Sequence, residues 1–224
     1  MRKLWIAAGM LAALFGVGAE TSPLFAAQLN LAGVAGVGSV AVVSLKEARF
    51  RTVIKQRYDF SCGSAALASL LTFHYGRPKS EEDVFAGMFA VGDKERIETQ
   101  GFSLLDMKTY LESIGMAGDG YRVDLDSVAE AKIPAIALIE TKGYRHFVLI
   151  KGVSDDEVVI GDPAFGVSIV KRAKFEPLMV SEVIFVIRSD YELGQQNFND
   201  KRDWAVRTKA PFGSALSRQG LANF

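Results

Sequence analysis

The chain has 224 residues, of which 49% are hydrophobic, 23% charged and 10% aromatic. These proportions are typical of a packed globular domain and exclude a chain that is disordered throughout. The 26 lysine and arginine residues balance the 26 aspartate and glutamate residues, so no bulk charge would draw the protein onto nucleic acid or an anionic membrane.

The N-terminus has the pattern of an export signal. A short basic start precedes an uncharged, apolar run of sixteen residues that ends before Glu20. The run is shorter than the roughly 20 residues that a membrane-spanning helix needs. We therefore expect a signal peptide over residues 1–27, cleaved after Ala19 or Ala27, with an uncleaved inner-membrane anchor as the alternative. Cleavage would leave a periplasmic protein without a stable membrane span.

The rest of the chain divides into three parts by composition. Residues 28–50 are rich in Gly, Ala and Val and show no regular periodicity, so we interpret them as an extended arm. The folded domain is expected over residues 51–192. Residues 193–224 form a polar, mildly basic C-terminal extension, which we expect to be flexible or bound to a partner.

Helices are expected in the first half of the domain, after a short strand at 51–55. Small and apolar residues predict a helix over 62–75, with Ser61 as its N-cap. Two more helices, each preceded by a capping box, are expected at 81–91 (Ser80 with Asp83) and 104–114 (Ser103 with Asp106).

The second half of the domain changes to short apolar runs separated by turn residues, which predict β-strands. The expected strands are residues 121–125, 135–140, 146–153, 158–162, 167–170 and 183–188. Helices followed by strands predict an α+β fold in which N-terminal helices pack on an antiparallel sheet.

Few residues are available for chemistry, because the chain has one cysteine and two histidines. Cys62 would lie in the first turn of its helix, where free backbone N–H groups and the helix dipole favour a thiolate, although burial as a small hydrophobic side chain is an equal alternative. His74 lies twelve residues further along the same helix, about 18 Å away, and cannot reach it. His146 opens a buried strand and is therefore the candidate base. We expect no cofactor and no metal ion, since a lone cysteine cannot form a two-cysteine metal motif.

Asp162 ends the strand that follows His146 and is the candidate for orienting the imidazole. A regular hairpin would pair Asp162 with Leu149, on the face opposite to His146. Contact therefore requires a bulge or strand break, which we expect at Gly161. The alternative role for this aspartate is to cap the turn before the following proline.

Three motifs taken together resemble those of the C39 peptidases, a family with the papain-like fold. They are Gln56 followed by Cys62 and a small-residue helix, then GYRHFVLIKGV, then VVIGDP. The resemblance implies Cys62 as the nucleophile and His146 as the general base and acid. It also implies that Asp162 orients His146, and that the Gln56 side chain and the Cys62 N–H form an oxyanion hole. Losing such a donor typically costs about 3 kcal/mol of transition-state stabilisation.

Members of this family that are fused to exporters usually have aspartate before the cysteine, where this chain has Ser61. The chain resembles stand-alone exported members, such as the C39-like component of functional-amyloid (Fap) secretion systems. This implies a periplasmic cysteine peptidase that cleaves a partner protein, such as a secreted fibre subunit or a secretion-system component, through a thioester. The alternatives are a binding or assembly factor without turnover, and an acyltransferase that uses the same residues.

Overall fold

The computed structural model describes residues 27–28, 41–42, 44–58 and 60–207. Most of the expected signal peptide and arm, and residues 208–224, lie outside these ranges. Residues 1–43 form one unit, in which β1 (Ala27–Gln28) pairs antiparallel with β2 (Ala41–Val42). All other elements belong to the second unit, residues 44–224.

The three expected helices are confirmed as α2 (Cys62–His74), α3 (Glu81–Val91) and α5 (Leu104–Ser113). Both capping boxes are present, at the starts of α3 and α5. Two short helices before the six-stranded sheet are additional: α1 (Leu45–Arg49) lies within the segment interpreted as an extended arm, and α4 (Lys94–Gln100) joins α3 to α5. Each begins at a side-chain cap, Ser44 for α1 and Asp93 for α4.

Six strands form one antiparallel sheet in the order β3-β8-β4-β5-β6-β7. Their bounds are Gly118–Arg122 (β3), Ala135–Thr141 (β4), Tyr144–Val153 (β5), Glu157–Asp162 (β6), Gly166–Lys171 (β7) and Met179–Ile187 (β8). The six strands predicted in the second half of the domain and the α+β class are confirmed. β3 lies three residues earlier than expected, because Asp124 caps α6 (Leu125–Ala131) and ends the extended stretch.

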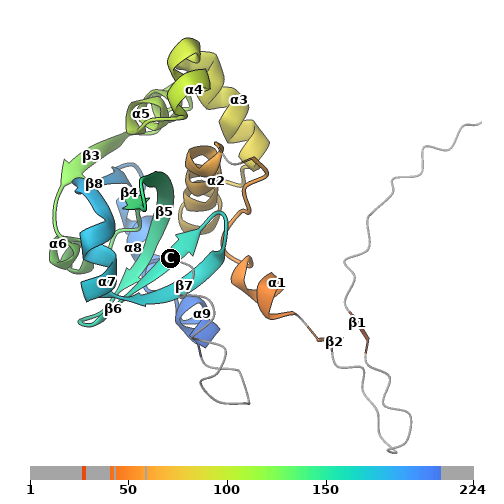
Figure 1. Cartoon of the computed structure of the whole chain (residues 1–224), viewed down its shortest axis with the longest axis vertical. Helices are drawn as coiled ribbons and strands as arrows, with labels where there is room; N and C mark the ends of the chain where they lie inside the picture. The colour runs from red at the N-terminus through yellow and green to blue at the C-terminus, as the bar shows by residue number, and fades with distance from the viewer. Residues whose placement is uncertain (1–26, 29–40, 43, 59, 208–224) are drawn as a thin grey trace, which may run out of the picture. The chain divides into compact units, whose positions relative to one another are not determined.

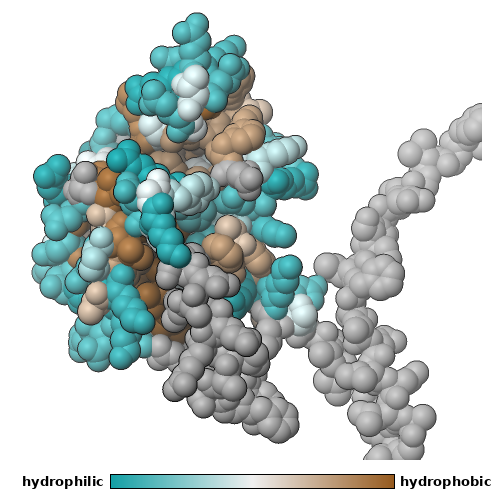
Figure 2. Space-filling view, viewed as in Figure 1, coloured by the Kyte–Doolittle hydropathy of each residue, from teal (hydrophilic) through white to brown (hydrophobic). Residues whose placement is uncertain are grey.

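Helices cover both faces of the sheet. One apolar cluster lies between α2, α3 and α5 and the face that carries Phe147 and Leu149. A second lies between α6, α7 (Arg172–Phe175) and the face that carries Val148 and Ile150. Neighbouring residues of β5 thus enter different clusters, as strand alternation requires. Figure 1 shows α2 against the sheet, with α3, α4 and α5 together at the top of the view. On the face in Figure 2, hydrophilic side chains predominate and hydrophobic ones form smaller patches.

The strand predicted at residues 51–55 is wrong. The N–H of Ile54 donates to Ser69 Oγ on α2 (2.8 Å), and the N–H of Gln56 donates to the Pro163 carbonyl (2.9 Å). These bonds hold the segment between α2 and the turn after β6. Its backbone groups therefore do not join a strand ladder.

The start of the expected C-terminal extension packs on the domain. α7 leads through η1 (Glu176–Leu178) into β8, after which come α8 (Tyr191–Gln196), α9 (Lys201–Trp204) and η2 (Ala205–Arg207). Asp203 of α9 is buried and accepts a hydrogen bond from the Thr52 hydroxyl (2.6 Å). Residues 193–207 thus contain helices that pack on the domain, in place of the expected extension that is flexible or bound to a partner. Among the residues described, no helix has both the length and the apolar character to span a membrane.

Candidate active site

Cys62 is the first residue of α2, and its side chain is nearly buried. Ser61 occupies the N-cap position as predicted, but its hydroxyl makes no capping bond. The hydroxyl instead donates to the Tyr58 carbonyl (2.8 Å) and contacts the Glu81 carboxylate. The N–H groups of the first turn of α2 are therefore left without a side-chain cap beside the thiol, where they favour a negative charge.

Glu81 holds the loop that leads into Cys62, a role that the sequence analysis missed. Its carboxylate is 3% exposed and accepts the Arg57 N–H through both oxygens, at 3.1 Å each, in addition to the Ser61 contact. Since Glu81 begins α3, this carboxylate ties α3 to the entry of α2. Its sequence position gave no signal, because an acidic residue in the first turn of a helix is ordinarily an exposed partner of the helix dipole.

The structure brings the side chains of His146 and Asp162 together. Nε2 of His146 lies 2.9 Å from Oδ1 of Asp162, and both side chains are buried. The same Oδ1 also accepts the N–H groups of Ala164 (2.7 Å) and Phe165 (3.2 Å), so the carboxylate both caps the turn and contacts the imidazole. The two roles considered for Asp162 in the sequence analysis are thus combined in one group.

Cys62 interacts with the same imidazole. Burial lowers the pKa of His146, but the hydrogen bond to Asp162 and the interaction with Cys62 outweigh burial and raise this pKa to about 9. Nε2 faces Asp162, whereas Nδ1 is buried and has no hydrogen-bond partner among the described residues. Nδ1 is therefore the ring nitrogen left for the thiol. The raised pKa favours an imidazolium next to Cys62, the kind of environment that activates a nucleophilic cysteine.

The β-bulge that permits this contact lies at Lys151 on β5, not at Gly161 as predicted. Near the turn, Val153 pairs with Val158, which is the register of a regular hairpin. The register shifts between Ile150 and Gly152, and beyond the shift Leu149 pairs with Gly161 in place of Asp162. Continuing this register sets Asp162 across from the residue before Leu149, on the same face as His146.

The backbone of Gln56 lies close to Asp162, because the Gln56 N–H donates to the carbonyl of Pro163, the residue after Asp162. Its Nε2 donates to the Tyr58 carbonyl (3.1 Å), and its Oε1 is buried without a hydrogen-bond partner in the described part of the chain. An amide nitrogen carries two N–H groups, so the bond to Tyr58 leaves one of them for a substrate oxygen.

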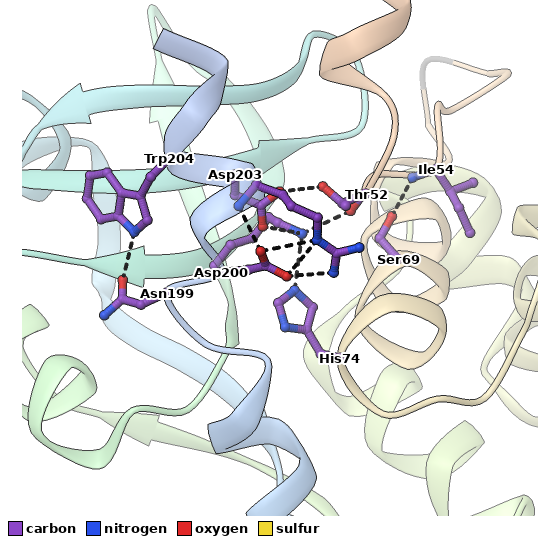
Figure 3. A network of polar contacts seen from close by, with 10 residues as sticks. Thr52, Ile54, Ser69, His74, Asn199, Asp200, Asp203 and Trp204 are labelled. Atoms are coloured by element: carbon purple, nitrogen blue, oxygen red, sulfur yellow. Dashed lines mark hydrogen bonds and ion pairs between the residues drawn. The ribbon is translucent and has the colours of Figure 1, made fainter. Parts of the chain in front are cut away.

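His74 lies at the opposite end of α2 from Cys62, as the helix geometry predicts, and its ring is 1% exposed. Burial, and secondarily the charge of Lys151, lower the pKa of His74 well below its usual value, so the ring is neutral. Lys151 Nζ lies 3.2 Å from Nε2 of His74. His74 therefore belongs to a buried polar network away from the thiol (Figure 3).

Aromatic side chains lie on the chain just before the thiol. Tyr58 and Phe60 are each 57% exposed and stack with ring centroids 5.7 Å apart. Phe60 also contacts Phe85 of α3 edge-on at 5.9 Å. A partly apolar surface is therefore present next to Cys62, suited to side chains of a bound peptide.

Comparisons with known proteins give a family match and named relatives. The sequence model of the Peptidase C39 family matches residues 51–190. The "probable functional amyloid protease FapD" of Pseudomonas aeruginosa (strain PAO1) is 43% identical over 171 residues, which are 75% of this chain and 76% of that protein. The protein of the same name from Pseudomonas fluorescens is 43% identical over 190 residues, 84% of each chain.

A solved structure supports the fold. The peptidase domain of Streptococcus ComA, a bi-functional ABC transporter involved in quorum sensing, aligns with a TM-score of 0.50 and 20% identity. The alignment covers 61% of this chain and 96% of that domain. From the extent of the family match and the identity to two relatives over most of their length, this chain belongs to the peptidase C39 family of cysteine peptidases.

Proposed function

We propose that this protein is a periplasmic cysteine peptidase that cleaves a peptide bond in a protein of functional-amyloid biogenesis, such as a fibre subunit or a secretion-system component. The observation that carries the chemistry is the contact of His146 Nε2 with Asp162, which leaves the buried Nδ1 for a thiol partner; Cys62 also helps to raise the pKa of this imidazole. The names of the two Pseudomonas relatives support the biological setting. The apolar N-terminal run supports export.

The reaction follows from the roles of these groups. The Cys62 thiolate attacks the scissile carbonyl carbon, and a C–S bond forms while the carbonyl oxygen becomes an oxyanion. The second N–H of Gln56 and the uncapped N–H groups of α2 stabilise this oxyanion. The His146 imidazolium then protonates the leaving amine as the C–N bond breaks, which leaves a thioester. A water molecule then gives a proton to His146 and attacks the thioester carbon; the C–S bond breaks, which releases the acid product and restores the thiolate beside the imidazolium.

The reactivity of Cys62 tests this proposal without knowledge of the substrate. Because the chain has one cysteine, iodoacetamide reports on Cys62 alone. At about pH 7 we expect Cys62 in the folded protein to be alkylated about tenfold faster than in the urea-unfolded chain, since a free thiol is mostly protonated there. His146→Ala should remove this advantage. Equal rates in the folded and unfolded chains would refute the catalytic role of the thiol.

Asp162→Asn is expected to weaken catalysis without abolishing it. The Asn side chain keeps the oxygen that accepts from Nε2 and from the turn, but it removes the negative charge beside the imidazolium. We expect processing to slow about 10- to 100-fold, since a neighbouring opposite charge is worth one or two pKa units. Asp162 raises the pKa of His146, so the alkaline limit of activity should also move to lower pH.

The matched control is Asp155→Asn, the same change at an exposed position in the turn of the same hairpin. The pH profile of processing, recorded by gel or mass spectrometry, should be unchanged in this control. A loss for Asp162→Asn as large as that for removal of the thiol would show that the carboxylate does more than orient and stabilise the imidazolium.

A further inference from the structure

A buried ammonium group sits at the β-bulge that sets the face of Asp162. Lys151 is 1% exposed, and its Nζ lies 3.0 Å from the Thr52 carbonyl, 3.2 Å from Nε2 of His74 and 3.2 Å from Oδ2 of Asp203. An ammonium has three N–H donors, and these three acceptors match them. Figure 3 shows Thr52, His74 and Asp203 approaching one another from three separate segments of the chain.

The path of the lysine side chain depends on Gly161. A Cβ atom at this position would lie 2.9 Å from Lys151 Cδ and 2.9 Å from Val53 Cγ2. Because Gly161 of β6 has no side chain, the side chain of Lys151 can extend across it toward Thr52. Gly161 matters to the bulge, as the sequence suggested, but it does so by leaving space for the residue that bulges.

The backbone of the bulge is held by the segment that follows α8. The Asn199 N–H donates to the Lys151 carbonyl (2.9 Å), and its side-chain amide donates to the Val153 carbonyl (3.2 Å). A Cβ atom on Gly152 would lie 2.2 Å from Asn199 Oδ1, so Asn199 packs directly on the strand. Asp203 binds the lysine side chain from the same segment. Residues 197–204 lie beyond the 51–190 range that the family model matches.

We propose that residues 197–204 form a brace that positions Asp162 against His146 by holding the bulge at Lys151. Without the bulge, the regular register that starts at Val153 would continue and turn Asp162 to the opposite face of the sheet. The brace also joins the segments that carry the other candidate catalytic groups. Thr52 leads to Gln56, and His74 ends the helix that Cys62 begins. This inference rests on the proposed function, because it concerns the alignment of the same dyad.

Asp203→Asn is the first test, because it keeps the shape of the side chain and removes the charge that binds Lys151. The measurement is the rate of Cys62 alkylation at about pH 6 divided by the rate at about pH 9, where any accessible thiol is largely ionised. The titratable groups that raise the pKa of His146 are Asp162 and Cys62. The aromatic ring of Tyr144 stacks on the imidazole. If Asp162 loses its alignment, the imidazolium is less stable, and we expect the ratio to fall about tenfold, which is one pKa unit.

Asn199→Gly is the second test. Asn199 has φ 58°, which glycine adopts without strain, so this variant removes the amide contacts but keeps the backbone path. We expect its ratio to fall in the same direction. Asp126→Asn is the matched control for charge, since Asp126 is exposed on α6 and pairs with Arg172 outside the brace. Val128→Ala, at a buried position of α6, is the control for lost stability alone. Neither control should change the ratio.

The outcomes separate this inference from the proposed function. Wild-type ratios in both Asp203→Asn and Asn199→Gly, with lowered unfolding midpoints, would overturn the brace and leave the peptidase standing. A fall in the ratio for Val128→Ala equal to that of the brace variants would overturn it as well, because general loss of stability would then be the cause. If the wild-type protein shows the profile of an ordinary thiol, the proposed dyad and the brace fail together.

Discussion

Cys62→Ala should abolish processing of the physiological substrate, with a loss of at least about 10⁴-fold, because removal of a nucleophile removes nearly all rate enhancement that depends on it. The fold should be retained. Small residues follow this position in α2, and alanine removes only the Sγ atom, so it introduces no new steric conflict. The measurement is mass spectrometry of envelope proteins from strains that carry either form, with search for the fragment that the wild type produces.

Cys62→Ser is the matched control, because it differs from the wild type by the replacement of sulfur with oxygen. It should be as inactive as Cys62→Ala, since a serine hydroxyl at this site is far less ionised than a thiol. A binding or assembly factor would keep its function in both variants. Full biofilm or fibre assembly in both would therefore contradict the peptidase and support that alternative. An amide product in place of a free carboxylate would indicate acyl transfer.

Lys151→Ala should lower the free energy of unfolding by about 3–5 kcal/mol, the usual cost of leaving one partner of a buried ion pair alone. The variant leaves the Asp203 carboxylate, which is 3% exposed, without the Lys151 charge; among the described residues, the Thr52 hydroxyl is the hydrogen-bond donor that remains to this side chain. Burial lowers the pKa of Lys151 while the charge of Asp203 opposes this shift, so each group depends on the other. Urea unfolding followed by circular dichroism measures the change.

Two comparisons separate the charge from the packing. Lys174→Ala removes an exposed lysine of α7 and should change stability by no more than about 0.5 kcal/mol. The double variant Lys151→Met with Asp203→Leu removes both charges and fills the same space, so it should recover most of the loss. A loss in the double variant equal to that in Lys151→Ala would show that the cost comes from packing, not from the stranded carboxylate.

Local signals in the sequence predicted the elements whose causes are local. The capping boxes of α3 and α5 and the apolar strand runs each act within a few residues, and all of them are confirmed. The segment at 51–55 has the same strand-like composition, but its Ile54 N–H bonds to Ser69, and the N–H of the following residue, Gln56, bonds to Pro163. Composition indicates that a segment can extend, but a strand also needs a partner, which is a tertiary condition.

The short helices α4 and α6 were missed for a related reason. Each has seven residues, too few for a clear 3.6-residue period, and each begins at an aspartate cap, Asp93 or Asp124, that looks like an ordinary turn residue. Glu81 and Asp203 were missed as buried carboxylates, because charged residues are nearly always exposed and nothing local distinguishes these two.

The sequence by itself determined which groups are available: a single thiol at the start of a helix, one imidazole able to reach it, and an acid on the next strand. It also showed that a regular hairpin would place that acid on the wrong face. Only the tertiary structure decided how the conflict is resolved, through the bulge at Lys151 and its contacts with Thr52, His74 and Asp203. Strand register depends on hydrogen bonds and burial among segments distant in sequence, so no window of neighbouring residues contains it.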